Sequence, residues 1–407
     1  MIEITPNEQQ EMAIEKAELW YKNFINDSEH KKQVFEIAGF AGTGKSTLVN
    51  FILKAIGLTI DDCLFLTYVG KAAMVLAMKG IPATTIHSAI YQYMEVPRTD
   101  SNGNIIMEDG FFVIDKKFVL KKHLPEHVKL LVIDEGFMVE DKLANDLLSF
   151  NLPVIVLGDP YQNSPIFGKP RFLINPDVVL TDIMRQNMDN PIIFLATKAR
   201  NCDWSLFNYA DYDNKVWVLS KDIMFDSFHK PVLDTIFSQS DAVICGRNST
   251  REKLNNYIRS EVYEKKGELN IGDKLINRRN DWSRCLENTI YLTNGLIGFV
   301  EDINYSSLTA KKVKIDFAPD FLHGHAFEGV ILDRKYLNMN YEEKKNYFNM
   351  YTNQLEYGYA ITCHLAQGSE YQQVAVYNER FFRSDIEYSR WIYTAITRAI
   401  DRLYIFV

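Results

Sequence analysis

The stretch VFEIAGFAGTGKSTLVNFI, residues 34–52, decides the fold of this chain. Residues 34–38 form a short apolar run, a glycine-rich loop follows at 39–46, and apolar residues then recur at helical spacing to about residue 56. The loop, GFAGTGKS, matches G-x-x-x-x-G-K-[ST], whose glycines let backbone N–H groups turn inward onto phosphate oxygens. An ordinary glycine turn is the alternative, but the order of strand, loop and helix favours a phosphate-binding loop.

The side chains of this loop suit ATP and Mg²⁺. Lys45 can neutralise the β- and γ-phosphates, and the Ser46 hydroxyl can ligate magnesium. The expected nucleotide-binding residues of the loop are Gly39, Gly42, Thr43, Gly44, Lys45, Ser46 and Thr47.

Two later apolar runs end in polar residues that suit ATP hydrolysis. LLVIDEGFM, residues 130–138, places Asp134 where it can hold the magnesium through water. Glu135 can then orient or deprotonate the attacking water. VIVLGDPYQNSPI, residues 154–166, contains Gln162, whose amide can sense a γ-phosphate. A solvated turn is the alternative for Asp134 and Glu135, but their position after a buried strand downstream of the glycine-rich loop favours a catalytic role. For Gln162, taken alone, a polar turn is an equal alternative.

The apolar runs also predict the domain organisation. Runs at 63–66, 130–133 and 154–157 alternate with helical stretches, which is typical of a parallel sheet covered on both faces. Asp109-Gly110 is a two-residue turn signal, and it predicts a hairpin in an inserted subdomain at about 88–125.

A second α/β series begins near residue 180 and is interrupted by a β-rich stretch. Its expected strands lie at 216–219, 242–245, 358–361, 373–376 and 403–406. Between the second and third of these, residues 266–350 contain short β-like pieces separated by Gly and Asn turns, which predicts a small β-barrel insert.

Composition limits the class of protein. With 407 residues and 47% apolar content, the chain is long enough for several globular domains. A net charge of -8 gives no overall attraction to nucleic acid or acidic membranes, so nucleic-acid binding requires a local basic groove. Five scattered cysteines without a C-x-x-C pair indicate reduced thiols, and no run approaches the roughly 20 apolar residues that span a bilayer. We therefore expect a soluble, cytoplasmic protein without a membrane partner.

The motifs QQEMA, GFAGTGKST, TYVGKAA, TTIHS, IDEGFM, GDPYQNSP, LTDIMRQ, AITCHLAQGSEY and YTAITRA, in this order, resemble those of the superfamily 1 helicases. The forms TTIHS and HLAQGSE, with GDKLIN and LTNGLIGFVEDI in the β-rich insert, look most like the 5′-to-3′ branch that contains Dda-type phage helicases and RecD-type enzymes.

The resemblance implies further nucleotide contacts. Gln10 would read the adenine, and Glu370 would lie near the nucleotide. Arg185 and Arg398 would reach the γ-phosphate from the second domain, which agrees with the ability of a guanidinium fork to neutralise charge across a cleft.

The resemblance also implies a groove for single-stranded DNA. The candidate strand-binding residues are Tyr68, Lys71, Thr85, His87, Thr362 and His364. Hydroxyls and lysine can hold phosphates, and aromatic rings can stack on bases. A core aromatic at Tyr68 and structural histidines at His87 and His364 are the alternatives. Phe111 or Phe112 would act as a wedge that separates the strands, or would be an ordinary pair of packing residues.

Two positions depart from the 5′-to-3′ pattern. Leu365 stands where these enzymes commonly have lysine, and Tyr68 stands where they commonly have proline. An aromatic residue at the second position is more typical of the opposite polarity, so the motifs support motor activity more strongly than direction.

The resemblance implies two tandem RecA-like P-loop α/β domains, with an inserted β-hairpin subdomain and a small SH3-like β-barrel. The expected boundaries are 1–180 for the first domain, 181–265 with 351–407 for the second, and 266–350 for the barrel. The expected function is ATP-dependent 5′-to-3′ DNA unwinding with ATP and Mg²⁺, in a bacterial or phage-infected cell. Expected partners are single-stranded DNA, a duplex fork, and single-strand-binding or replication proteins. The alternatives are a translocase that remodels protein–nucleic acid complexes or acts on RNA, and a recruitment module with an inactive P-loop.

Overall fold

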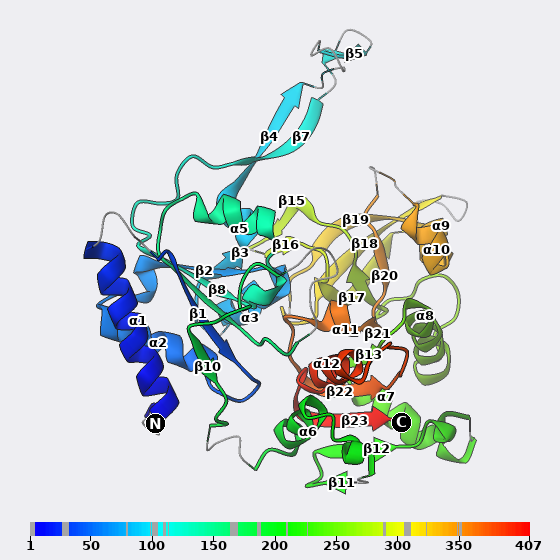
Figure 1. Cartoon of the computed structure of the whole chain (residues 1–407). Coiled ribbons are helices and arrows are strands. Elements are labelled where there is room, and N and C mark those ends of the chain that lie inside the picture. The colour runs from blue at the N-terminus through cyan, green and yellow to red at the C-terminus, as the bar shows by residue number, and fades with distance from the viewer. Residues whose placement is uncertain are drawn as a thin grey trace.

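The computed structural model describes residues 5–26, 32–78, 80–97, 99, 105–108, 111–112, 114–162, 170–184, 189–208, 211–225, 227–287, 290–304, 311–322, 324–347, 349 and 352–407. Over these residues the chain forms two six-stranded sheets, a five-stranded antiparallel sheet and three two-stranded ribbons (Figure 1). The prediction of an α/β class is confirmed.

The first six-stranded sheet has the order β10-β1-β9-β8-β2-β3, and its strands are parallel. Its strands are β1 Val34–Gly39, β2 Cys63–Thr67, β3 Ala83–Thr85, β8 Leu130–Asp134, β9 Val154–Gly158 and β10 Val178–Leu180. Its helices are α1 Glu8–Asn26, α2 Lys45–Ile56, α3 Gly70–Met78, α4 Ile86–Ile90 and α5 Asp141–Leu148.

Alternating side chains of these strands supply two separate cores. Leu130 and Val132 of β8 pack with α1 and α2 on one face, whereas Leu131 and Ile133 pack with α4 and α5 on the other. This is why the strand is a continuous apolar run: both of its faces are covered.

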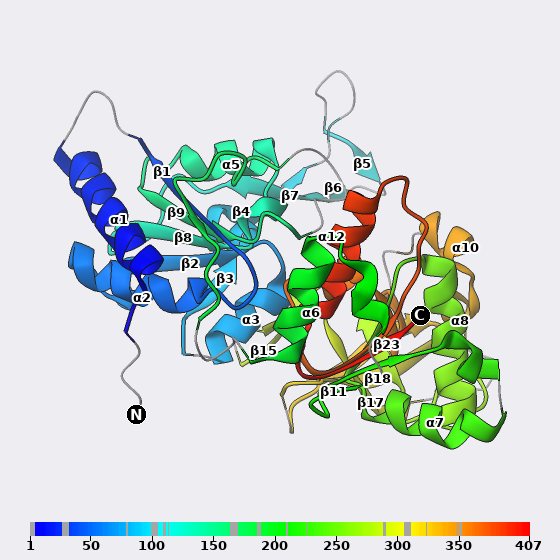
Figure 2. The same ribbon diagram turned by 60° about the horizontal axis from the view of Figure 1, so that its bottom comes forward.

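The second six-stranded sheet has the order β11-β12-β23-β22-β13-β21. Its strands are β11 Asp211–Tyr212, β12 Val216–Leu219, β13 Ala242–Cys245, β21 Ala360–Thr362, β22 Tyr371–Tyr377 and β23 Ala399–Phe406. Its helices are α6 Pro191–Arg200, α7 Lys230–Gln239, α8 Asn248–Tyr257, α11 Cys363–Ala366 and α12 Asp385–Ile396. In Figure 2, α6 and α12 lie on the side of this domain that faces the first domain.

A β-ribbon projects from the first domain (Figure 1). Strands β4 Tyr91–Pro97 and β7 Ile114–Leu120 pair antiparallel, and β5 Met107–Glu108 pairs with β6 Phe111–Phe112 at the far end. The ribbon lies within the predicted insert at 88–125, and β5 and β6 flank the predicted turn; Asp109 and Gly110 themselves lie outside the described residues.

The antiparallel sheet has the order β19-β18-β17-β14-β20. Its strands are β14 Lys274–Asn277, β17 Ile297–Asn304, β18 Lys312–Pro319, β19 Phe327–Asp333 and β20 Leu355–Tyr357. A separate ribbon is formed by β15 Asp281–Leu286 and β16 Ile290–Leu292, and the short helices are α9 Arg334–Asn338 and α10 Tyr341–Lys345. Among the described residues, the shorter helical segments are η1 Ile60–Asp62, η2 Gly136–Met138, η4 Trp204–Asn208, η5 Lys221–Phe225, η6 Ser227–His229 and the π-helical η7 Ile258–Val262.

Strand β20 corrects the predicted boundary at residue 351. It pairs with β14, and Leu355 is fully buried in the core of the antiparallel sheet, so this strand does not belong to the second α/β sheet. The strand predicted at 358–361 begins only at Ala360. Gly358 lies between the two strands, where a Cβ atom would come within 2.9 Å of the Leu275 carbonyl carbon. A side chain at this position would collide with β14.

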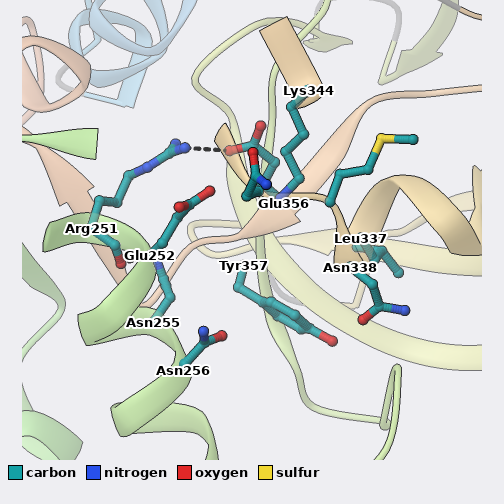
Figure 3. A pocket seen from close by; sticks show the side chains of 11 residues that line it. Arg251, Glu252, Asn255, Asn256, Leu337, Asn338, Lys344, Glu356 and Tyr357 are labelled. Carbon is teal, nitrogen blue, oxygen red and sulfur yellow. Dashed lines mark hydrogen bonds and ion pairs between the residues drawn. The ribbon is translucent and has the colours of Figure 1, made fainter. Parts of the chain in front are cut away.

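Buried charges join the second α/β domain to the insert (Figure 3). Arg251 of α8 contacts Glu356 of β20 at 2.8 Å, and these residues are only 2% and 5% exposed. Tyr336 of α9 donates a hydrogen bond to the same carboxylate at 3.0 Å. A cavity of about 280 Å³, also lined by Lys344, lies beside them.

Two further properties of the described residues concern the cysteines and the helices. All five cysteines are free thiols, as predicted. Within the part of the chain that the structure describes, every helix is too short or too polar to traverse a bilayer.

Candidate active site

The predicted phosphate loop connects β1 to α2 and depends on its glycines. Gly42 and Gly44 have φ values of 81° and 77°, in the left-handed region that side chains rarely adopt. At Gly39, a Cβ atom would approach Thr43 Oγ1 to 2.7 Å. The Lys45 Nζ folds back over the loop and donates to the carbonyl oxygens of Gly39 and Phe40, at 2.6 and 3.1 Å.

The hydroxyl residues of the loop differ in their surroundings. Thr43 is fully buried, and its Oγ1 donates to the Phe40 carbonyl at 2.8 Å, so it holds the loop together. Ser46 is exposed and Thr47 is partly exposed in the first turn of α2. Their N–H groups are in the first turn of a helix, where anions bind favourably.

Gln10 supports the loop from α1. Its Nε2 donates to the Thr43 carbonyl at 3.1 Å, and its Oε1 accepts the Asn7 N–H at 3.1 Å. Because Gln10 is only 1% exposed, the structure gives it a role in positioning the loop. Adenine recognition by Gln10 stays a prediction.

The two carboxylates at the end of β8 lie at the domain interface. Burial, followed by the neighbouring Asp134 carboxylate, raises the pKa of Glu135 to about 7, whereas the charges of Arg398 and Lys45 act to lower it. The structure therefore brings Lys45 of the phosphate loop and Arg398 of the second domain within electrostatic range of Glu135. Glu135 also has a positive φ of 55°, a strained backbone that is typical of functional sites.

Gln162 lies beside Asp159, after β9. It is 7% exposed, its N–H donates to the Asp159 carbonyl at 3.3 Å, and its Oε1 is buried without a hydrogen-bond partner among the described residues. An uncommitted amide oxygen in this place suits the predicted sensor.

Arg398 follows α12 and is only 4% exposed. Its Nε donates to the Thr394 carbonyl at 3.1 Å, and its Nη1 donates to the Ser369 carbonyl at 3.1 Å. These bonds orient the guanidinium from its own domain. Glu370, which follows Ser369, is exposed; Arg185 lies outside the described residues.

Three residues at the interface were missed by the sequence analysis. Tyr393 of α12 accepts the Ala41 N–H at 2.9 Å and donates to Asp159, and Arg200 lies 3.7 Å above the Phe40 ring. The hydroxyl of Tyr161 donates to the Arg200 carbonyl at 2.8 Å. Tyr393 stands in YTAITRA and Tyr161 in GDPYQNSP, so both motifs were recognised, but only their most familiar polar residues were selected.

An aromatic group lies at the base of the β-ribbon. The Tyr68 ring is 6.2 Å from His87, which is exposed and lies 5.8 Å from Tyr91. Tyr68 packs partly against the core on the α4–α5 face of the first sheet, so it combines the packing role with an aromatic surface suited to base stacking. Tyr91 was not selected from the sequence because it lies outside the motifs.

The other first-domain residues predicted to contact single-stranded DNA, Lys71 and Thr85, are more deeply buried. Lys71 is 8% exposed and lies 3.3 Å from the Tyr371 hydroxyl and 3.8 Å from Asp320, so it joins the first domain to the second domain and the insert. The Thr85 Oγ1 caps α4 by accepting the Ser88 N–H at 3.1 Å. Phosphate contacts by Lys71 and Thr85 stay predictions.

The motif AITCHLAQGSEY, residues 360–371, is packed into the second domain. Thr362 is 7% exposed, burial lowers the pKa of His364, and Leu365 packs against the core of this domain. Leu365 therefore has a packing role where the 5′-to-3′ pattern has lysine. Phe111 and Phe112 form β6 at the tip of the ribbon, but their side chains lie outside the described part of the structure.

Comparison with known families matches both α/β domains. Residues 24–205 match the AAA domain family, and residues 357–406 match the UvrD-like helicase C-terminal domain family. The ATP-dependent DNA helicase dda of Enterobacteria phage T4 is 28% identical over 268 residues, covering 61% of this chain and 57% of the relative. The ATP-dependent RecD2 DNA helicase of Deinococcus radiodurans is 26% identical over 389 residues, covering 90% of this chain and 46% of the relative. The chain thus spans about half the length of these two relatives.

Solved structures match the whole fold. A Pif1 helicase from work on unwinding at forked dsDNA has a TM-score of 0.52 at 16% identity, covering 99% of this chain and 92% of the other. Bacteroides Pif1 bound to ssDNA has a TM-score of 0.52 at 15% identity, covering 100% of this chain and 93% of the other. These likenesses establish the arrangement of RecA-like domains. In its two family matches and in the relatives it aligns with, the chain is similar to superfamily 1 helicases of the Dda and RecD types.

Proposed function

We propose that this chain is an ATP-dependent DNA helicase that translocates on single-stranded DNA in the 5′-to-3′ direction and separates duplex strands. The observation that carries the proposal is that Arg398, held in the second domain by the Thr394 and Ser369 carbonyls, acts electrostatically on Glu135 of the first domain. An arginine supplied across a cleft makes hydrolysis depend on contact between the domains, so the ATP cycle can drive their relative movement. The names of the dda and RecD2 relatives, and the strand bound to Bacteroides Pif1, support DNA as the substrate.

Mg²⁺ fits the oxygen donors of the proposed site. Magnesium is commonly held by one or two protein oxygens together with substrate phosphates and water, and the Ser46 hydroxyl and Asp134 carboxylate supply such oxygens. Among the described residues, no group of three or more His, Cys, Asp or Glu side chains forms an alternative metal site. Bound Mg²⁺ would neutralise charge on the β- and γ-phosphates, while Lys45 binds the same phosphates and Glu135 orients the water.

The domains would divide this work. We propose residues 1–180 as the first RecA-like domain, and 181–265 with the chain after β20 as the second. The antiparallel sheet, with the β15–β16 ribbon, would form the SH3-like barrel. The β4–β7 ribbon would act as the separating pin, with Phe111 or Phe112 at its tip, and the aromatic group of Tyr68 and His87 would bind the strand.

Matched duplexes with a 5′ or a 3′ single-stranded tail, in DNA and RNA versions, test the function and its direction. We expect ATP-dependent unwinding of the 5′-tailed DNA. Unwinding of the 3′-tailed DNA would reverse the assigned polarity, and translocation without unwinding would favour a remodelling translocase. An absence of strand-stimulated ATP turnover would favour the recruitment module.

The raised pKa of Glu135 predicts a pH dependence. A water-activating carboxylate must be ionised, so the rate should fall as pH decreases through the pKa of about 7. At saturating MgATP and DNA, we expect kcat for ATP hydrolysis to rise about tenfold from pH 6 to pH 8. Glu135→Gln should be nearly inactive and lack this rise. A flat wild-type profile over this interval would contradict the assigned base.

A further inference from the structure

A single tyrosine hydroxyl connects the two α/β domains at the phosphate loop. The Tyr393 hydroxyl accepts the Ala41 N–H at 2.9 Å and donates to the Asp159 carboxylate. Tyr393 and Asp159 are each only 1% exposed, so water is largely excluded from the bridge. Ala41 and Tyr393 are separated by 352 residues in the sequence, and only contact between the domains brings them together.

The chemistry of this hydroxyl suits a fixed bridge. Burial, followed by the charge of Asp159, holds the pKa of Tyr393 well above its ordinary value. The hydroxyl therefore keeps its proton, and it can donate to the carboxylate while its oxygen accepts the N–H. A charge-assisted bond of this kind, shielded from water, is strong and directional.

The bridge is linked to three parts of the proposed catalytic machinery. Ala41 belongs to the phosphate loop, Asp159 accepts the Gln162 N–H through its carbonyl, and the helix that carries Tyr393 leads directly to Arg398. A shift of the Tyr393 hydroxyl would therefore be expected to displace the phosphate loop, Gln162 and Arg398 together.

We propose that Tyr393 is a positioning residue for ATP hydrolysis, and that its hydroxyl aligns the phosphate loop with Arg398 by joining Ala41 to Asp159. The proposal rests on the ATPase function proposed above. The hydroxyl acts through the loop and the carboxylate, so its contribution belongs to the rate of the chemical step rather than to ATP binding.

The test is Tyr393→Phe, which keeps the ring and removes the bridge. We expect kcat for DNA-stimulated ATP hydrolysis to fall about 10- to 100-fold, since small misplacements of catalytic groups have effects of this size. KM for ATP should change less than about threefold, because the loop and Lys45 still bind the phosphates. Asp159→Ala with Tyr393→Phe should be no slower than Asp159→Ala alone, because the link from Ala41 to Asp159 is already broken once the carboxylate is removed.

Tyr161→Phe is the matched control. The Tyr161 hydroxyl also crosses between the domains, to the Arg200 carbonyl at 2.8 Å and Ser389 at 2.7 Å, but it does not contact Ala41. An equal fall in kcat for both variants, or a wild-type kcat for Tyr393→Phe, would overturn the proposal.

Hydrogen exchange at the Ala41 amide separates failure of this inference from failure of the ATPase function. Faster exchange in Tyr393→Phe than in Tyr161→Phe would support the bridge even if the chain hydrolysed no ATP. Equal exchange at this amide in wild type and Tyr393→Phe would overturn the bridge even if the chain were an active ATPase.

Discussion

Lys45→Ala is expected to lower kcat for DNA-stimulated ATP hydrolysis by about 10²- to 10³-fold, a range typical for removal of one preorganised electrostatic group. Lys45 is the charged group of the phosphate loop, and its Nζ already lies over the loop, at 2.6 Å from the Gly39 carbonyl. Without it, the β- and γ-phosphates would lose their neutralising ammonium as charge develops in the transition state. Steady-state ATP turnover with saturating single-stranded DNA measures the effect, and unwinding should be lost with it.

Lys54→Ala is the matched control for this prediction. Lys54 lies on the same helix but is exposed in its last turn, so the substitution removes one lysine from α2 without changing the loop. We expect its turnover to stay within about twofold of wild type. Undiminished strand-stimulated turnover in Lys45→Ala would show that ATP is hydrolysed elsewhere, and the active-site assignment would be wrong.

Local patterns were enough to predict the elements that form the proposed ATP site. The strands expected at 216–219 and 242–245 appear as β12 and β13 with the same bounds, because both are contiguous apolar runs, and β13 is buried throughout between parallel neighbours. The phosphate loop was likewise predictable, because its glycines are required by backbone geometry within eight residues.

Features that depend on distant contacts were not predictable in the same way. The sequence around Leu355 does not show that β20 pairs antiparallel with β14 rather than joining the adjacent α/β sheet. The sequence around Lys71 does not show that its Nζ lies beside Tyr371 of the second domain and Asp320 of the insert. Tyr393 reaches the phosphate loop only after both domains have folded and met, so its position in the motif does not reveal its partner.

Glu356→Gln is expected to destabilise the junction between the second domain and the insert by about 3–5 kcal/mol, the usual cost of breaking a buried ion pair from one side. Burial opposes ionisation of Glu356, but Arg251, Arg278 and Lys344 together lower its pKa, so the carboxylate is charged at neutral pH. The substitution would keep the shape of the side chain and leave Arg251, which is 2% exposed, without its counter-charge. A lower midpoint of the thermal or urea transition that includes the insert measures this loss.

The sign of the pH dependence follows from the lowered pKa of Glu356. The ion pair stabilises the fold fully above the carboxyl's pKa in the unfolded chain, and this stability is lost as pH falls through the lower pKa of the folded state. The difference between wild type and Glu356→Gln should therefore narrow in acid. Glu342→Gln, on the exposed surface of α10, should change stability by less than about 0.5 kcal/mol.

A double substitution separates a buried ion pair from simple packing. Figure 3 shows the Arg251 guanidinium paired with Glu356. If the cost of Glu356→Gln comes from leaving this guanidinium without a counter-charge, adding Arg251→Met should recover part of the lost stability. If packing dominates, the second substitution should add its own cost instead. Equal stability of Glu356→Gln and Glu342→Gln would show that the charges at this junction are compensated by solvent, and that the insert is held to the second domain by its apolar contacts alone.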